Sequence, residues 1–153
     1  MDKLRELEEK YIEERIAILQ KLTDKYGEEV LNIAAEVKSK LEYSRAKDLF
    51  QKDIPVNMEK YYNYAFNEFE NLKDSVEHEI VELTKNKLIL KVHKCKYCDI
   101  YSKFSGNQIA KRTVCDMDLP ITKALNESFT LERPSRKMDG DKFCTFIITK
   151  KEV

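Results

Sequence analysis

The segment VEHEIVELTKNKLILKV, residues 76–92, marks the point where the pattern of the chain changes from helical to extended. Two short runs rich in aliphatic and β-branched residues flank the polar tetrapeptide Thr84-Lys85-Asn86-Lys87, which is typical of an antiparallel hairpin. Successive side chains of a strand point to opposite faces, so we expect Leu88, Leu90 and Val92 on one side of a sheet. The hairpin predicts an antiparallel sheet in the second half of the chain.

A second hairpin is predicted near the C-terminal end of the sequence. Its strands are residues 129–133 and 143–149, which are separated by Pro134 and by the turn Met138-Asp-Gly-Asp141. Between the two hairpins, residues 99–126 are expected to be helical in pieces. The predicted fold class is therefore α+β, with an antiparallel sheet of about four strands and helices inserted between two hairpins.

Asp118 precedes Leu119-Pro120 in this inserted region. Proline is tolerated in the first turn of a helix, and aspartate is a preferred residue at the N-cap. The sequence therefore predicts that Asp118 caps a helix, as an alternative to a chemical role.

The first half of the sequence is predicted to be helical, because its first 50 residues contain one glycine and no proline. Apolar residues recur every three or four positions over residues 2–25 and again from Val30 to Phe50, with Gly27 as a C-cap or kink between them. Glu14 interrupts a strict seven-residue repeat. We therefore expect these helices to pack on the rest of the chain or on a homodimer mate, and not to form an independent coiled coil.

A third helix is predicted over residues 58–71, after the helix-breaking Pro55 and with Asn57 as its cap. Its aromatic stripe is expected in the core. The stripe consists of Tyr61, Tyr62, Ala65, Phe66 and Phe69. We divide the chain into a helical arm or layer, residues 1–56, and an α+β domain, residues 57–153, packed as one compact unit.

The composition limits the classes of partner that we expect. The 153 residues include 28 basic and 28 acidic residues, a balance that gives no reason to expect nucleic acid or an anionic membrane as a partner. No apolar run is long enough for a signal peptide or a membrane span, so a cytoplasmic protein is expected. Thiols stay reduced in that compartment, and the four cysteines are expected to be free thiols, metal ligands or reactive groups.

The spacing of the cysteines leaves three interpretations open. Cys95 and Cys98 form a Cys-x2-Cys pair, and Cys115 and Cys144 follow. Two thiolates on a tight turn can hold one tetrahedral ion, so the four cysteines are candidate ligands of zinc or of an iron–sulfur cluster. The pair could instead be a redox dithiol at a helix N-terminus. Third, the thiols could be small buried residues, which suits Cys144 in its strand.

Two histidines occur in the sequence, and His93 is the one that immediately precedes the cysteine pair. A histidine in that position is a candidate ligand or general acid. We expect His93 to be an exposed strand residue without a chemical role.

Several positions of the second half form a recognisable combination. They are Cys95-x-Tyr97, Cys115-x-x-Asp118, Asn126, Arg133, Gly140-Asp141 and Cys144-x-Phe146. From Cys95 onward, this combination resembles the family named for L-2-amino-thiazoline-4-carboxylic acid hydrolase. The resemblance implies an α+β domain akin to four-vinyl-reductase domains. It also implies a hydrolase that opens a small sulfur-containing ring at a cyclic amidine or thioimidate carbon.

The same resemblance implies roles for individual residues. Cys95 or Cys115 would supply a thiolate nucleophile, Asp118 would act as a base or orienting group, and Asn126 would donate a hydrogen bond. The expected substrate-binding residues are Tyr97, Arg133 and Asp141.

This chain departs from the family pattern at Lys96, Cys98 and Glu127, and Cys98 is the departure most able to change the chemistry. The alternative function is a non-catalytic module of four-vinyl-reductase type that binds zinc, an iron–sulfur cluster or a small ligand and dimerises through its N-terminal helices. A further alternative is a scaffold in which the cysteines only stabilise the fold.

Overall fold

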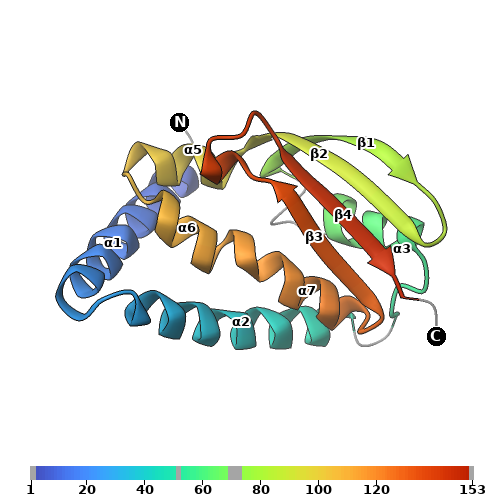
Figure 1. Ribbon diagram of the computed structural model, residues 1–153, viewed down its shortest axis with the longest axis horizontal. Helices are drawn as coiled ribbons and strands as arrows, with labels where there is room; N and C mark the ends of the chain where they lie inside the picture. Colours follow the sequence, from blue (N-terminus) through green and yellow to red (C-terminus); the bar gives the residue numbers. More distant parts are fainter. Residues whose placement is uncertain (1–2, 51–52, 69–73, 152–153) are drawn as a thin grey trace.

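Two long helices that meet at a glycine begin the chain. The computed structural model describes residues 3–50, 53–68 and 74–151, and its first helices are α1 (Lys3–Tyr26) and α2 (Glu29–Phe50). Gly27 has a φ of 83°, the left-handed conformation that glycine adopts without steric strain. The helices diverge from this corner as a V (Figure 1). The predicted break at Gly27 is confirmed.

A short α-helix and a π-helical segment follow Pro55. The Asn57 Oδ1 accepts a hydrogen bond of 2.9 Å from the Lys60 backbone N–H and caps α3 (Met58–Tyr62), as predicted. The chain then continues as the π-helix η1 (Asn63–Glu68). The third helix predicted over residues 58–71 is thus present from Met58 to Glu68, and residues 69–71 lie outside the described residues. Its π geometry was not predicted, because apolar spacing alone does not distinguish i→i+4 from i→i+5 hydrogen bonds.

The aromatic stripe of this region faces the core as expected. Tyr61, Ala65 and Phe66 are buried, and Tyr62 packs against them from a partly exposed position. Phe69 lies outside the described residues.

Four antiparallel strands form one sheet in the order β1-β2-β4-β3. Their bounds are β1 (Val76–Leu83), β2 (Lys87–Cys95), β3 (Phe129–Ser135) and β4 (Cys144–Lys150). Both predicted hairpins are present, and β2 pairs with β4 to join them, with Leu90 opposite Phe146. The α+β fold class is confirmed.

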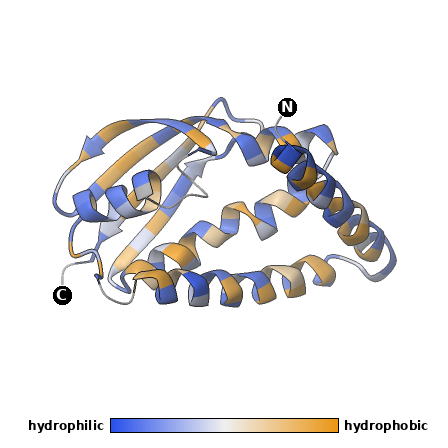
Figure 2. Ribbon diagram, turned by 180° about the vertical axis from the view of Figure 1, so that it is seen from behind, coloured by the Kyte–Doolittle hydropathy of each residue, from blue (hydrophilic) through white to orange (hydrophobic). Residues whose placement is uncertain are grey.

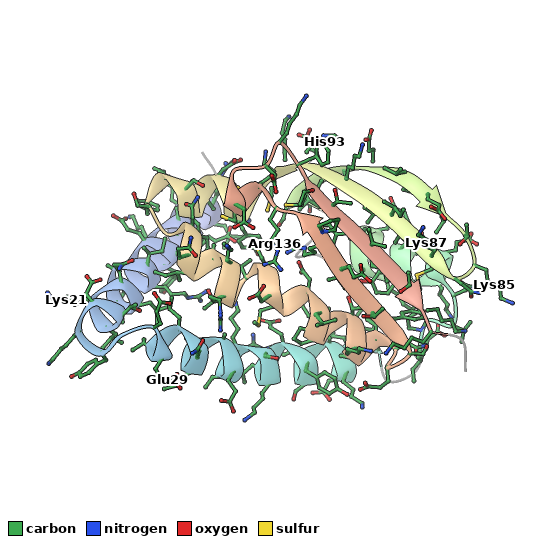
Figure 3. The ribbon with its side chains drawn as sticks, in the orientation of Figure 1. Lys21, Glu29, Lys85, Lys87, His93 and Arg136 are labelled. Carbon is green, nitrogen blue, oxygen red and sulfur yellow. The ribbon has the colours of Figure 1, made fainter. Side chains whose placement is uncertain are left out.

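One face of the sheet is buried and the other is open. Leu88, Leu90 and Val92 lie on the buried face as predicted, together with Cys144 and other residues of β4. Helices α3 and α7 (Asp118–Leu125) lie against this face (Figure 1). In the view from behind, apolar and polar residues alternate along the strands (Figure 2). His93 is on the open face, 3.4 Å from Glu79, and points away from the helices (Figure 3).

Pro134 lies inside β3 and does not end that strand as predicted. The pairing of β3 with β4 is irregular between Glu132 and Ser135, and β3 is an edge strand. At such a position the missing backbone N–H of proline is not needed for the sheet.

Short helices connect the two hairpins and complete the fold. They are α5 (Lys96–Lys103), α6 (Asn107–Thr113), the 3-10 turn η2 (Cys115–Met117) and α7, and the further 3-10 turn η3 (Lys137–Asp139) lies between β3 and β4. Met117 and not Asp118 is the N-cap of α7, and the Asp118 carboxylate pairs with Arg133. The capping prediction for Asp118 is therefore wrong, because a buried arginine supplies a stronger partner than the backbone N–H groups of the first turn.

Gly106, between α5 and α6, allows α1 to approach closely. A Cβ atom at this position would lie 2.6 Å from Cδ1 of Ile16. The contact places α1 against α5 and α6, so that the N-terminal helix becomes part of the core. Within the described ranges, no helix is both long and apolar enough to cross a membrane.

Candidate ligand cavity

A cavity of about 160 Å³ lies between the buried face of the sheet and the helices α1, α2 and α5. Its lining is mostly apolar and comes from helices, strands and turns alike. For comparison, an apolar cavity of about 150 Å³ holds one benzene molecule. The N-terminal helices α1 and α2 supply Ile12, Arg15, Lys38 and Glu42. The space therefore depends on both parts of the chain.

Most of the residues singled out from the sequence line this cavity. They are Tyr97, Asp118, Arg133 and the four cysteines Cys95, Cys98, Cys115 and Cys144. Residues as distant in the sequence as Cys95 and Cys144 are thus brought to one place by β2, α5, η2, α7, β3 and β4.

Asn126 and Asp141 are not among the lining residues. Asn126 follows α7, where its Nδ2 donates to the Pro55 carbonyl at 2.9 Å and its Oδ1 accepts from the backbone and hydroxyl of Ser128. The Asp141 Oδ2 accepts a 2.8 Å hydrogen bond from the Arg136 backbone N–H. The contacts of both side chains are those of loop-stabilising residues.

Asp118 and Arg133 form a buried ion pair in the cavity wall. Arg133 Nη2 lies 2.8 Å from Asp118 Oδ2, and the Arg133 side chain is only 8% exposed. Nη1 donates to the Cys115 carbonyl at 3.1 Å, and the guanidinium lies 4.0 Å from the ring centroid of Phe146. The Arg133 Nε is buried and has no hydrogen-bond partner among the described residues. Nε is therefore a donor without a partner on a residue that lines the cavity.

Tyr101 supplies a second polar atom without a partner. The residue is fully buried and lines the cavity, and its hydroxyl has no hydrogen-bond partner in the described part of the chain. A buried hydroxyl without a partner is unfavourable for the fold. Tyr101 was not predicted from the sequence, although its position in the amphipathic pattern of residues 97–104 could have placed it on the inner face of a helix.

Burial controls the protonation of the acidic groups in the cavity. It raises the pKa of the Cys115 thiol to about 12, and Arg133 offsets this only in part. Burial also raises the pKa of Cys95 and of Cys98. The pKa of Asp118 is raised for the same reason, although Arg133 acts in the opposite direction. These three thiols are therefore protonated at neutral pH, and a thiol is a much weaker nucleophile than a thiolate.

Basic side chains outnumber acidic ones in the lining. The lining contains two acidic residues, Glu42 and Asp118, and four basic ones. The basic residues are Arg15, Lys38, Arg133 and Lys137. The only ion pair of Lys38 within the described residues is a long one, 3.9 Å to Glu42, and burial followed by repulsion from Arg15 lowers the pKa of Lys38. The local charge therefore favours a molecule that carries a negative group.

The four cysteines share the cavity but do not form a metal centre. Among the described residues, no group of three or more histidine, cysteine, aspartate or glutamate side chains is placed to hold a metal ion. Structural zinc requires about four ligands around one point. The arrangement of these donors does not fit the predicted zinc or iron–sulfur site.

The solved structures that are similar to this chain include the following two. The phenol-responsive sensory domain of the transcription activator PoxR, in complex with phenol, has a TM-score of 0.54 and 13% sequence identity, and covers 91% of this chain and 74% of that domain. The Fe(II) unliganded H-NOX protein from K. algicida has a TM-score of 0.46 and 14% identity, with coverages of 88% and 70%. At these identities the likeness to PoxR concerns the fold alone, and the H-NOX likeness carries no argument.

No curated protein matches the sequence. The sequence profile of the family described as L-2-amino-thiazoline-4-carboxylic acid hydrolase matches residues 5–148, nearly the whole chain. The match extends well beyond the C-terminal part that carried the resemblance, into both N-terminal helices. The chain belongs to the L-2-amino-thiazoline-4-carboxylic acid hydrolase family.

Proposed function

We propose that the protein binds a small organic anion with a single ring in the cavity between the sheet and the N-terminal helices. The observation that carries this proposal is the pair of unpartnered polar atoms, Arg133 Nε and Tyr101 Oη, on residues that line a mostly apolar cavity of about 160 Å³. Ligand pockets typically combine apolar walls with a few fixed polar groups.

The ring and its polar groups would have different neighbours. Val92, Cys144 and Phe146 offer an apolar wall on the sheet side. Arg133 keeps its orientation because Asp118 and the Cys115 carbonyl each bind one of its terminal nitrogens. We expect the ligand to bond to its unpartnered Nε. A carboxylate is the preferred partner of such a guanidinium N–H.

The comparisons support a ligand of this size. The domain of PoxR responds to phenol, a single-ring molecule. The family is described by a substrate with a five-membered ring and a carboxylate group. Both molecules consist of one ring with polar substituents, which is the class that the volume and charge of this cavity favour.

Titration calorimetry with 2-amino-thiazoline-4-carboxylate, benzoate and phenol tests the binding proposal. We expect the two carboxylates to bind more tightly than phenol, and Arg133→Gln to weaken their binding at least tenfold. Arg136→Gln is the matched control, because Arg136 pairs with Asp116 and does not line the cavity. If wild-type protein binds none of the three molecules, the proposal is wrong.

Arg133→Gln also removes a buried charge, so a second variant separates binding from folding. Tyr101→Phe keeps the ring and removes only the unpartnered hydroxyl. We expect this variant to fold normally and to bind the carboxylates several-fold more weakly, since it loses one hydrogen bond of about 0.5–1.5 kcal/mol.

Ring-opening hydrolysis is a second candidate function, and membership of the hydrolase family favours it. In such a reaction, water adds to the carbon between sulfur and nitrogen of the thiazoline, and the ring carbon–sulfur bond breaks. The sulfur takes up a proton, and N-carbamoyl-cysteine results. Asp118 is the best candidate to remove the proton from water, because burial brings its pKa closer to neutrality. A Cys115 thiolate is less well supported, since the pKa of that thiol is about 12.

Thiol release from 2-amino-thiazoline-4-carboxylate, followed by mass spectrometry, tests the hydrolase function. We expect Asp118→Asn to abolish turnover and to keep some binding, whereas Cys115→Ser keeps turnover. If wild-type protein binds the thiazoline without turnover, the hydrolase function is wrong and the alternative of a non-catalytic ligand-binding module is favoured. Loss of turnover in Cys115→Ser, with binding intact, would restore the thiolate mechanism.

A homodimer through the N-terminal helices is a further part of the proposal. Helix α1 exposes Tyr11 and Ile18, and α2 exposes Ile33, Val37 and Leu41, each by about half or more of its surface. Exposed apolar side chains in such numbers are typical of interaction surfaces. Light scattering of wild-type protein and of an Ile33→Lys, Val37→Glu variant measures the mass; a monomeric wild type contradicts the dimer.

A further inference from the structure

We propose that Cys95 and Cys98 form a dithiol that closes reversibly into a disulfide in the wall of the cavity. Cys95 is the N-cap of α5, and Cys98 is the third residue of the same helix. Side chains three positions apart on a helical turn have Cβ atoms about 5–6 Å apart. A disulfide needs Cβ atoms about 3.5–4.5 Å apart, so closure brings the two Cβ atoms roughly 1–2 Å closer. The backbone of Cys95 is extended and not yet helical, so the start of α5 is where this adjustment takes place.

Cys95 is the better placed of the two thiols to attack first, because it precedes the first turn of α5. Burial raises the pKa of Cys95, and the backbone N–H groups of Cys98 and Tyr97 at the start of α5 act in the opposite direction. Helix N-termini favour negative charge on a sulfur atom. Cys95 is also the more exposed of the two, whereas Cys98 is 8% exposed.

The other two thiols of the cavity have different positions. Cys115 is on η2 and Cys144 is on β4, so neither shares a helical turn with another cysteine. The Cys144 Sγ accepts a hydrogen bond from the Lys137 backbone N–H at 3.2 Å. This bond links the start of β4 to the turn η3. The closure therefore involves the pair on α5 and leaves Cys115 and Cys144 reduced.

The oxidant is a low-molecular-weight disulfide such as oxidised glutathione. The Cys95 thiolate attacks one sulfur of that disulfide, forms a mixed disulfide and releases one glutathione thiolate. The Cys98 sulfur then attacks the Cys95 sulfur and releases the second glutathione. Two protein thiols lose their protons and are oxidised, and one glutathione disulfide is reduced to two thiols.

Closure would change the ligand site, because both cysteines line it and α5 also carries Tyr97 and Tyr101. The disulfide replaces two S–H groups with one bridge and fixes the first turn of α5. A ligand that binds one redox form more tightly must shift the equilibrium between the two forms by the same factor. This coupling rests on the proposed ligand-binding function, whereas the closure itself does not.

Equilibration of the reduced, folded protein with mixtures of oxidised and reduced glutathione at pH 8 tests the closure. Free thiols are then alkylated and counted by mass spectrometry, with peptide mapping. We expect the number of free thiols to fall from four to two, with Cys95 and Cys98 linked in one peptide. Cys115→Ser and Cys144→Ser should still close this pair, whereas Cys95→Ser and Cys98→Ser should not.

Three results overturn the proposal: four free thiols after a full day in oxidised glutathione, a glutathione adduct on Cys95 that is stable in wild-type protein, or a disulfide that involves Cys115 or Cys144. As a control, the reduced protein is unfolded in urea and treated with the same alkylating reagent. Alkylation of all four thiols confirms that the reagent is active.

A second series with saturating benzoate tests the coupling to the ligand. We expect bound benzoate to change the equilibrium ratio of disulfide to dithiol at least threefold. An unchanged ratio with bound benzoate contradicts the coupling and leaves the closure intact. If benzoate does not bind, the proposed function is contradicted, and the thiol counts without ligand still decide the closure.

Discussion

Two arginine–aspartate pairs on neighbouring segments have nearly the same N–O distance and different surroundings. The inner pair, Arg133 with Asp118, has an N–O distance of 2.8 Å, with side chains 8% and 22% exposed. The outer pair, Arg136 with Asp116, has a distance of 2.7 Å, with side chains 26% and 36% exposed. Asp116 lies in η2, and Asp118 is the first residue of α7. Arg133 lies in β3, and Arg136 follows directly after that strand. Figure 3 labels Arg136 near the end of β3.

Burial, and not the N–O distance, distinguishes the ion pair in the cavity wall from the ion pair at the surface. The guanidinium of the inner pair also lies on Phe146 and bonds to the Cys115 carbonyl, and its Nε has no partner among the described residues. The outer pair is close to water, where the attraction between opposite charges is weak. Substitutions at the two pairs can show how far this difference extends.

The largest effect is expected from removal of the inner cation. Arg133→Gln leaves the Asp118 carboxylate in a buried position without its partner, which should lower the free energy of unfolding by about 3 kcal/mol at pH 7. Burial already raises the folded-state pKa of Asp118 above the unfolded value, so its charged form destabilises the fold at neutral pH. The loss should therefore shrink as the pH falls through that pKa. Urea denaturation across pH 4–7 measures it, and a loss that grows towards low pH would contradict this account.

A smaller loss is expected when the aromatic partner of Arg133 is removed. Phe146→Leu keeps an apolar side chain but loses the contact of 4.0 Å between the guanidinium and the ring. A desolvated contact of this kind contributes about 2 kcal/mol, so a loss of roughly that size is expected by urea denaturation. Ile148→Val, a buried position on the same strand, is the control for simple loss of volume.

A measurement of the Asp118 pKa compares the effects of the two arginines on one carboxyl group. Carbon-detected NMR of the carboxyl group should give a midpoint above the ordinary value of 3.8, because burial is the largest influence. Arg133→Gln should raise this pKa further than Arg136→Gln does, since Arg133 lowers it more strongly. Equal shifts in the two variants would mean that the two arginines act on Asp118 equally.

The smallest effect is expected at the outer pair. Arg136→Gln should change the free energy of unfolding by at most about 1 kcal/mol, and a high salt concentration should remove most of that change. Thermal unfolding at two salt concentrations provides the measurement. A loss as large as that of Arg133→Gln would show that exposure does not explain the difference between the pairs.

The local pattern of the sequence predicted much of the fold. The alternation of residues 88–92, the cap at Asn57 and the break at Gly27 are each determined by neighbours a few positions away, and all three are confirmed. The π-helical turns of η1 and the strand that continues through Pro134 depend on tertiary packing and on the edge position of β3. Local spacing carries no information about either feature.

The site was accessible to sequence reasoning only in part. Most of the residues singled out from the sequence line the cavity, and the family that their motifs suggested is confirmed. The chemical roles of these residues stay predictions, and so does the cytoplasmic location. The contributions of Arg15 and Lys38 could not be predicted, because they depend on how α1 and α2 fold back over the sheet. Asn126 matched a motif but holds the Pro55 carbonyl outside the cavity.

The order of the strands has a consequence for the synthesis of the protein. Strand β4, residues 144–150, lies in the middle of the sheet between β2 and β3 and brings Cys144 and Phe146 to the cavity. Until the ribosome has made β4, β2 and β3 cannot be joined, and each has an open edge. The four-stranded sheet and the cavity wall that β4 supplies therefore cannot be complete before residues 144–150 have been made. A chain that stops before Cys144 would lack the strand that joins β2 to β3 and, with it, two residues of the cavity wall.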